Sequence, residues 1–275
     1  MNYETAQNEF IKLIESNCYE FQAWELFTDF CKMTAISLYQ PFIKSEELEK
    51  EYMNTISKYN KKVIEIFPKL LSYLVMALED RMGDFLGECF MDLKLGSKYK
   101  GQFFTPYYVS SFMASIVGSN PIEEKESMVE PCCGSGVMII ARADAIKREY
   151  GFEYQNIMEV QAIDVDVLCV YMSFIQLSLL GISAEVIHGN ALSNEIFATW
   201  YTPKYIMNAS IREYQTNKNN NNKNKKESKK ELSPKDKHSQ SKTQKEKVTL
   251  PCDTIENKLL YSKQELEVFA TGRLF

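Results

Sequence analysis

The feature that most constrains the fold is a glycine turn between a short apolar strand and a helix. An apolar stretch covers residues 127–131, the letters EPCCGSG occupy 130–136, and a helical pattern follows over 137–150. Glycine allows a ligand to approach the backbone closely and tolerates a positive φ. The helix that follows presents unpaired N–H groups at its start. The turn therefore predicts a ligand site, and the alternative is a glycine turn that holds no ligand.

Strand and helix patterns alternate after this turn. Residues 160–164 read as a strand, 167–180 as a helix and 184–188 as a third strand, and an amphipathic helix over 107–117 precedes the whole series. Strands that alternate with helices of this length favour an α/β fold with a parallel sheet and right-handed crossovers.

The region before residue 96 has a different pattern. Apolar side chains recur there at steps of three and four, the period of a helix with one apolar face. Pro68 is expected to end or kink one of these helices. The pattern predicts an N-terminal helical domain over residues 1–95.

The glycine turn does not complete the dinucleotide fingerprint. The pattern GxGxxG would need a third glycine where Ile139 stands, and Asp164 lies beyond the ~20 residues usual for the acidic position. A carboxylate at the end of a second strand still suits ribose hydroxyls. The alternative for Asp164, or for its neighbour Asp166, is an N-cap on the next helix. S-adenosylmethionine binds with the same geometry as NAD but has no pyrophosphate, so a shorter glycine pattern is enough to hold it.

Three blocks together carry a family resemblance. The letters DFLGE at 84–88, GQFFTP at 101–106 and EPCCGSG at 130–136 resemble, in order and spacing, consecutive blocks of the modification (methylase) subunit of type I restriction systems. Those subunits are adenine-N6 DNA methyltransferases. The resemblance covers about residues 80–210 and implies a Rossmann-like methyltransferase fold. We expect its sheet to be incomplete, because only about four strands can be placed before Arg212.

The resemblance also implies a set of residues that bind S-adenosylmethionine. They are Phe104, Thr105, Glu130, Cys132, Gly134, Gly136, Asp164 and Asn190. Phe104 and Thr105 are implied to line the methionine end, and the four residues of the glycine turn to lie under the cofactor. Asp164 is implied to hold the ribose hydroxyls and Asn190 to approach the adenine. The alternative for Phe104 and the adjacent Phe103 is packing in the core.

The catalytic block of the family is altered in this chain. In the family, a fourth strand ends in Asn-Pro-Pro-Phe or Asn-Pro-Pro-Tyr, where the Asn and a proline carbonyl accept the amino protons of a flipped adenine and the aromatic ring stacks on the base. The corresponding stretch, 204–211, reads KYIMNASI, so Asn208 is the implied catalytic residue and Ile211 replaces the aromatic. The alternative for Asn208 is an ordinary turn residue.

Two functions follow from this resemblance. The first is a restriction–modification type DNA adenine-N6 methyltransferase that uses S-adenosylmethionine. The second is a catalytically inactive methylase fold that binds S-adenosylmethionine, DNA or a restriction–modification complex. DNA is the expected partner in the first case, and a specificity or restriction subunit is a possible further partner.

Charge is unevenly distributed along the chain. The formal net charge is −5, yet residues 216–248 hold eleven Lys against four acidic residues. We expect this segment to be a disordered linker, and contact with a phosphate backbone is the alternative. The methyltransferase core is then expected over 96–215, and the apolar residues within 249–275 predict a C-terminal segment that docks on the core or stays free.

Composition argues against several other classes. The seven cysteines form no CxxC pair and no metal-ligand spacing with the two histidines, so no metal site is predicted. An odd number of cysteines in a sequence that shows no signal peptide favours a reducing, cytoplasmic location. No stretch approaches the ~20 apolar residues of a membrane span.

Overall fold

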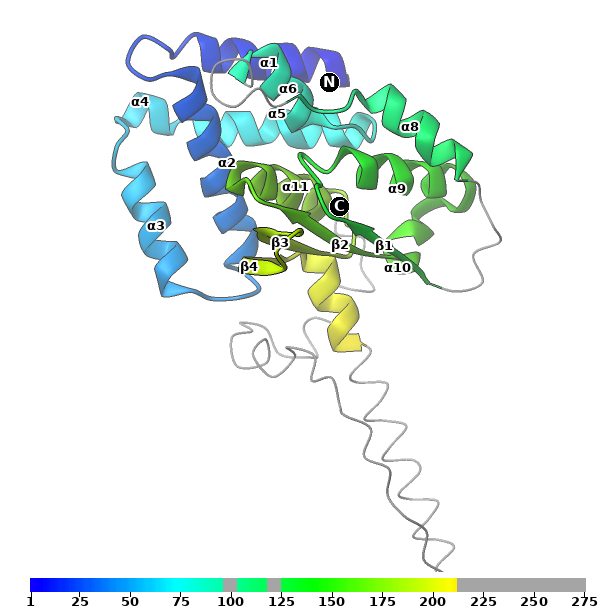
Figure 1. Ribbon diagram of the computed structural model, residues 1–275. Coiled ribbons are helices and arrows are strands. Elements are labelled where there is room, and N and C mark those ends of the chain that lie inside the picture. The colour runs from blue at the N-terminus through cyan, green and yellow to red at the C-terminus, as the bar shows by residue number, and fades with distance from the viewer. Residues whose placement is uncertain (96–102, 118–124, 212–275) are drawn as a thin grey trace, which may run out of the picture. The chain divides into compact units, whose positions relative to one another are not determined.

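A computed structural model describes residues 1–95, 103–117 and 125–211 of the chain (Figure 1). The elements are α1 (Tyr3–Glu15), α2 (Ala23–Tyr39), α3 (Glu46–Ile56), α4 (Lys61–Ile64), α5 (Ile66–Asp80), α6 (Phe85–Asp92), α8 (Tyr107–Ile116), β1 (Glu126–Glu130), α9 (Val137–Tyr150), η1 (Gly151–Glu153), α10 (Tyr154–Ile157), β2 (Met158–Asp164), α11 (Val167–Leu179), β3 (Ala184–Asn190) and β4 (Glu195–Tyr201). The chain divides into two compact units, Met1–Ile206 and Met207–Phe275. The predicted segments 216–248 and 249–275 lie outside the described residues.

The helices of the N-terminal region pack around aromatic side chains. Phe10 of α1 is fully buried and meets Phe30 of α2 and Phe85 of α6 edge to face, with ring centroids 5.4 and 5.3 Å apart. Edge-to-face pairs of this kind add to the free energy gained by burying the rings. The same compact unit contains the sheet, so these helices are part of its core.

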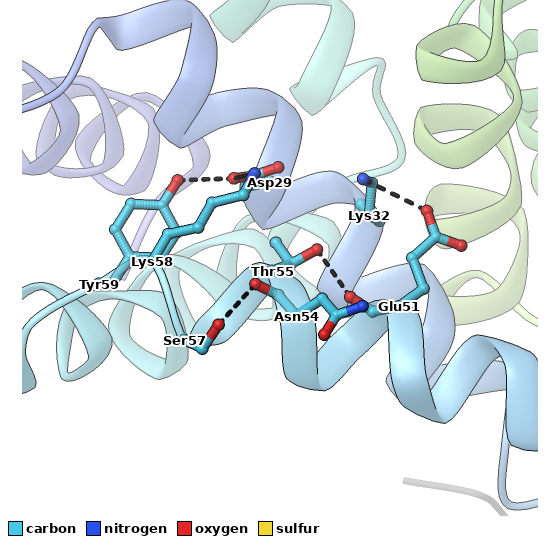
Figure 2. Close-up of polar contacts among 8 residues, drawn as sticks. All are labelled: Asp29, Lys32, Glu51, Asn54, Thr55, Ser57, Lys58 and Tyr59. Atoms are coloured by element: carbon cyan, nitrogen blue, oxygen red, sulfur yellow. Dashed lines mark hydrogen bonds and ion pairs between the residues drawn. The ribbon is translucent and has the colours of Figure 1, made fainter.

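A buried carboxylate holds α2 against the turn that follows α3 (Figure 2). Asp29 is 5% exposed, and it accepts hydrogen bonds from the Tyr59 hydroxyl at 2.8 Å and the Lys58 ammonium at 3.0 Å. A salt bridge of 3.3 Å between Lys32 and Glu51 adds a second link between α2 and α3. A buried carboxylate needs such donors, because leaving it unpaired would cost several kcal/mol.

The sheet has the strand order β1-β2-β3-β4, and its first three strands are parallel. The prediction of a parallel sheet is confirmed for these three, and α9 begins and ends at the predicted residues. In the register, Glu130 lies beside Ala162, and Asp164 lies beside His188. The carboxyl ends of β1, β2 and β3 therefore form one edge, where the polar side chains predicted from the sequence end their strands.

The fourth strand departs from the prediction. β4 runs antiparallel to β3 after a tight hairpin over 191–194. Gly189 makes the hairpin possible, because a Cβ at this position would lie 2.5 Å from the Glu195 carbonyl oxygen. Asn194 adopts a φ of 57°, a left-handed conformation that asparagine tolerates better than most residues. The chain therefore reverses direction here and does not cross over to a further parallel strand.

The stretch 204–211, which corresponds to the end of the family's fourth strand, does not end a strand here, because residues 203–211 are helical. Thr202 begins this helix: its backbone carbonyl accepts the Ile206 N–H at 3.2 Å, and its side-chain oxygen accepts the Tyr205 N–H at 3.4 Å. Pro203 follows at the first helical position, where its missing N–H costs nothing. The pair Thr202-Pro203 thus begins a helix. The comparison of 204–211 with the family's catalytic block gave no indication of this helix.

Helix α11 lies between the sheet and the helices of the N-terminal region (Figure 1). It contacts β2 and β3 on one side and α2 and α6 on the other. Apolar residues accordingly cover most of its surface, as expected for a helix buried all round. Within the described residues, no helix is both long and apolar enough to cross a membrane.

Candidate functional site

The loop between β1 and α9 has the backbone conformation that its glycines permit. Gly134 has a φ of 54° and Gly136 a φ of 96°, both in the region that favours glycine. The loop is closed by the Gly136 N–H, which donates to the Cys133 carbonyl at 2.8 Å. The Cys133 N–H donates to the Ile163 carbonyl at 2.9 Å, which ties the loop to β2. No side chain caps α9, so its first N–H groups are directed toward the loop.

Asp164 connects the end of β2 to the same loop. One carboxylate oxygen accepts the Gly134 N–H at 2.9 Å, and the other accepts the Asp166 N–H at 2.9 Å. The N-cap of α11 is Asp166, whose side chain accepts the Leu168 N–H at 3.0 Å. An ionised carboxylate offers about four acceptor positions, so these two bonds leave Asp164 with capacity for further donors.

The turn that contains Phe104 converges on the glycine loop. A Cβ added to Gly134 would lie 3.1 Å from Cδ1 of Phe104, so the ring packs directly on the glycine backbone. Phe90 of α6 also meets this ring edge to face, at a centroid distance of 5.1 Å. Phe103 points elsewhere, because 75% of its surface is exposed. Phe104 therefore packs partly in the core, as the alternative expected, whereas Phe103 does not. Thr105, the next residue, is exposed.

The block at 84–88 reaches the loop from a third direction. Asp84 caps α6 by accepting the Gly87 N–H at 3.1 Å, and it is 1% exposed. The Ser135 hydroxyl donates to its carboxylate at 2.6 Å. Burial raises the pKa of the Asp84 carboxyl, and the hydrogen bonds from Gln176, Ser135 and Gly87 oppose that rise. Described residues from all three sequence blocks that carried the resemblance therefore meet at one place.

The remaining loop residues differ in burial. Glu130 ends β1 and is half-buried. Burial raises the pKa of its carboxyl, and a hydrogen bond from the Cys132 N–H opposes the rise. Cys132 is exposed, whereas Cys133 is buried, and burial raises the pKa of the Cys133 thiol to about 12. A thiol with that pKa stays protonated at neutral pH, so Cys133 acts as a packing residue.

Asn190 ends β3 and organises the hairpin that follows. Its side-chain oxygen accepts the N–H groups of Leu192 at 3.0 Å and Ser193 at 3.4 Å. Asn208 lies in the helix over 203–211, within the part of the chain assigned to the second unit. The structure thus joins Phe104, Gly134 and Asp164 by direct contacts, with Glu130 at the end of β1 and Cys132 in the same loop as Gly134. It places Asn208 on a separate element.

Sequence reasoning missed two residues that hold this loop. Ser135 and Gln176 are both fully buried and hydrogen-bonded to Asp84. A signal was present in the sequence: Gln176 is a long polar side chain inside the otherwise apolar helix pattern of 167–179. A buried polar side chain in such a pattern requires partners.

A parallel sheet with a glycine loop after its first strand and a carboxylate ending its second defines the class of α/β folds that bind nucleotide-like cofactors at the carboxyl edge. The family model described as N-6 DNA methylase matches residues 79–245, and the chain belongs to this family. S-adenosylmethionine is accordingly the cofactor. The site fits it: the Phe104 ring lies on the bare backbone of Gly134 and offers an apolar wall, and Asp164 can accept further hydroxyl donors.

One solved structure of comparable fold is a Listeria monocytogenes protein described as a class I S-adenosylmethionine-dependent methyltransferase. It is 15% identical, the similarity covers 70% of this chain and 55% of that one, and the TM-score is 0.42. The present chain thus spans about half of that protein's length. No curated protein matches the sequence.

Proposed function

We propose that this chain holds S-adenosylmethionine in the loop after β1 and transfers its methyl group to the N6 amino group of adenine in DNA, as part of restriction–modification. The observation that carries the proposal is the contact between Phe104 and Gly134, because it brings the Phe-Thr-Pro turn onto the glycine loop. Two stretches that are 30 residues apart in sequence are thereby in contact at the proposed binding site.

The proposed binding roles follow from groups already placed at the carboxyl edge. Asp164 holds the loop through the Gly134 N–H and accepts the ribose hydroxyls with its remaining acceptor positions. Phe104 forms an apolar wall, and the exposed Thr105 hydroxyl faces the methionine carboxylate. Because the Asn190 oxygen accepts from the hairpin, its amide N–H groups are the donors that an adenine ring nitrogen would accept.

The proposed chemical role falls to Asn208. A side-chain amide oxygen that accepts an amino proton of the flipped adenine leaves the nitrogen lone pair directed at the methyl group. Ile211 stands where the family has an aromatic residue, and a lost base stack weakens binding by ~1–3 kcal/mol. We therefore expect weak binding of the target base and slow turnover.

A second candidate function is binding of S-adenosylmethionine and DNA without methyl transfer. The observation that favours it is the helix over 203–211, which replaces the strand end where the family carries its catalytic Asn. A helix and the end of a strand orient an Asn side chain differently, and the rate of methyl transfer depends steeply on that orientation.

Calorimetry with S-adenosylmethionine and a labelled-methyl assay on unmethylated DNA test both candidates. The first expects binding, transfer to adenine N6, and a loss of turnover of about 100-fold in Asn208→Ala with an unchanged cofactor Kd. Asn54→Ala, which alters an exposed position on α3, is the matched control and should change neither value. Binding without transfer supports the second candidate, and absence of cofactor binding would overturn both.

A further inference from the structure

A buried polar cluster joins the helical region to the glycine loop. Asp84 caps α6, Ser135 lies in the loop and Gln176 lies on α11, and each is at most 1% exposed. The Ser135 hydroxyl donates to one Asp84 oxygen at 2.6 Å, and the Gln176 amide donates to the other at 2.9 Å. Three elements that are far apart in sequence thus share one carboxylate.

Gln176 completes the cluster with both ends of its amide. The nitrogen also donates to the Ser135 carbonyl at 2.9 Å, and the oxygen accepts the Leu86 N–H at 3.0 Å. Only a glycine fits at position 87, because a Cβ there would collide with the Asp84 side chain. Every polar atom of the Gln176 side chain therefore has a partner, as a buried amide requires.

Ser135 is the residue through which this cluster acts on the loop. Its neighbours Gly134 and Gly136 both have a positive φ, and glycine loses more conformational freedom on folding than any other residue. A loop with two such glycines needs contacts from outside to keep a single conformation. The cluster grips Ser135 by its hydroxyl and by its carbonyl, between the two glycines.

We propose that Asp84 and Gln176 are positioning residues, which fix the Gly134–Gly136 loop in the conformation that binds the cofactor. They act through Ser135 and do not themselves touch the cofactor. The proposal rests on the proposed function for its effect on cofactor affinity, and it extends the binding machinery to α6 and α11. The block at 84–88 then has a physical reason to accompany the glycine block in this chain.

A purely structural role is the alternative, and Asp29 provides the matched control. Asp29 is also a buried carboxylate with two side-chain donors, Tyr59 and Lys58, but these contacts join α2 to the turn after α3. Asp29→Ala and Asp84→Ala should both lower the melting temperature, since both leave buried donors without an acceptor. Asp84→Ala alone should disturb the loop.

The experiment compares the full-length chain with its Asp84→Ala, Asp84→Asn, Ser135→Ala and Asp29→Ala variants. Calorimetry measures the Kd for S-adenosylmethionine, and hydrogen exchange without ligand measures protection of the amides in residues 133–140. We expect about a tenfold rise in Kd for Asp84→Ala and a smaller rise for Ser135→Ala, because hydrogen bonds to a buried charge are among the stronger ones. Both variants should exchange faster in this segment. Asp29→Ala should match the unaltered chain in both measurements.

Asp84→Asn is the conservative variant that should restore the loop. Its amide nitrogen can donate to the Ser135 oxygen, and its amide oxygen can still accept from Gln176 and Gly87. Unchanged Kd and exchange in Asp84→Ala and Ser135→Ala, or an equal change in Asp29→Ala, would overturn the proposal. If the unaltered chain binds no cofactor, the proposed function fails, and hydrogen exchange still decides whether the cluster holds the loop.

Discussion

The two ends of the sheet's carboxyl edge are built differently. At β1 and β2, the loop is held by contacts from other elements: Asp164 receives the Gly134 N–H, and Phe104 packs on Gly134. At β3, the hairpin is closed by its own Asn190 side chain, and the first four residues of β4 are exposed. The first region is the proposed cofactor site, whereas the second is a hairpin followed by a helix.

Under the proposed function, the cofactor-binding part and the catalytic part of this sheet are held by different contacts. One part can therefore match the family's sequence blocks while the other departs from them. Resemblance in the glycine loop therefore carries no information about residue 208, and the two regions require separate tests.

The largest effect is expected where β4 is anchored. Trp200 is 5% exposed and meets the rings of Tyr39 at 4.9 Å and Phe174 at 5.3 Å. Trp200→Ala should lower the free energy of unfolding by about 3–5 kcal/mol, because it removes a large buried side chain and leaves a cavity. Phe197→Ala, on the same strand but 56% exposed, should change it by less than about 0.5 kcal/mol. Denaturant unfolding measures both, and equal effects would show that packing does not anchor the hairpin.

The glycine loop gives the next largest effect, on cofactor binding. Gly134→Val forces a branched side chain against Phe104 at a φ of 54°, and we expect the affinity for S-adenosylmethionine to fall about 100-fold. Gly151→Val is the control, because Gly151 has a φ of 63° but nothing within 4 Å of the added Cβ. Calorimetry should find its Kd unchanged. Similar losses in both variants would mean that backbone strain, and not contact with Phe104, controls the site.

A smaller effect is expected at the end of β2. Asp164→Asn removes an oxygen that accepts the Gly134 N–H and places an amide beside that donor, so the Kd for S-adenosylmethionine should rise about tenfold. Asp166→Asn is the matched control two residues away, since Asn caps a helix as well as Asp does. If Asp166→Asn weakens binding equally, the start of α11 and not the Asp164 carboxylate determines affinity.

The first region was predictable from sequence because its signals are local and physical. A strand that ends in Gly134 and Gly136 and opens a helix has few solutions, and α9 accordingly begins and ends at the predicted residues. The convergence of Phe104 on this loop followed from the family resemblance. No periodicity would have shown it, because it depends on contacts between distant parts of the chain.

The hairpin and the helix of the second region were not predicted, because this stretch was compared only with the family's catalytic block. Gly189, Asn190 and Asn194 are turn residues, and Thr202-Pro203 is a helix start. Together they indicate a hairpin and then a helix. The roles of Ser135 and Gln176 could not be derived, since a sequence shows that a buried amide needs partners but not which ones.

The smallest effect concerns the pH dependence of stability, to which the buried Asp84 carboxyl beside the glycine loop contributes. Burial raises the pKa of the Asp84 carboxyl above its ordinary value of 3.8. A folded-state pKa above the unfolded one means that the folded chain binds the proton more tightly, so stability rises as pH falls from the raised pKa toward 3.8. Asp84→Asn cannot take up this proton, because an amide does not titrate in this range. As the pH is lowered from 7 through this window, the melting temperature of the unaltered chain should therefore rise by roughly a few degrees relative to that of Asp84→Asn.

Glu88 reinforces this trend, because the Asp84 charge contributes to the raised pKa of the Glu88 carboxyl and is absent in the variant. Groups that do not interact with Asp84, such as those of the hairpin, contribute equally to both proteins and cancel in the difference. A gap between the two melting temperatures that stays constant with pH would mean that the Asp84 carboxyl has the same pKa in the folded and the unfolded chain. The hydrogen bonds from Gln176, Ser135 and Gly87 would then offset the whole cost of burying its charge.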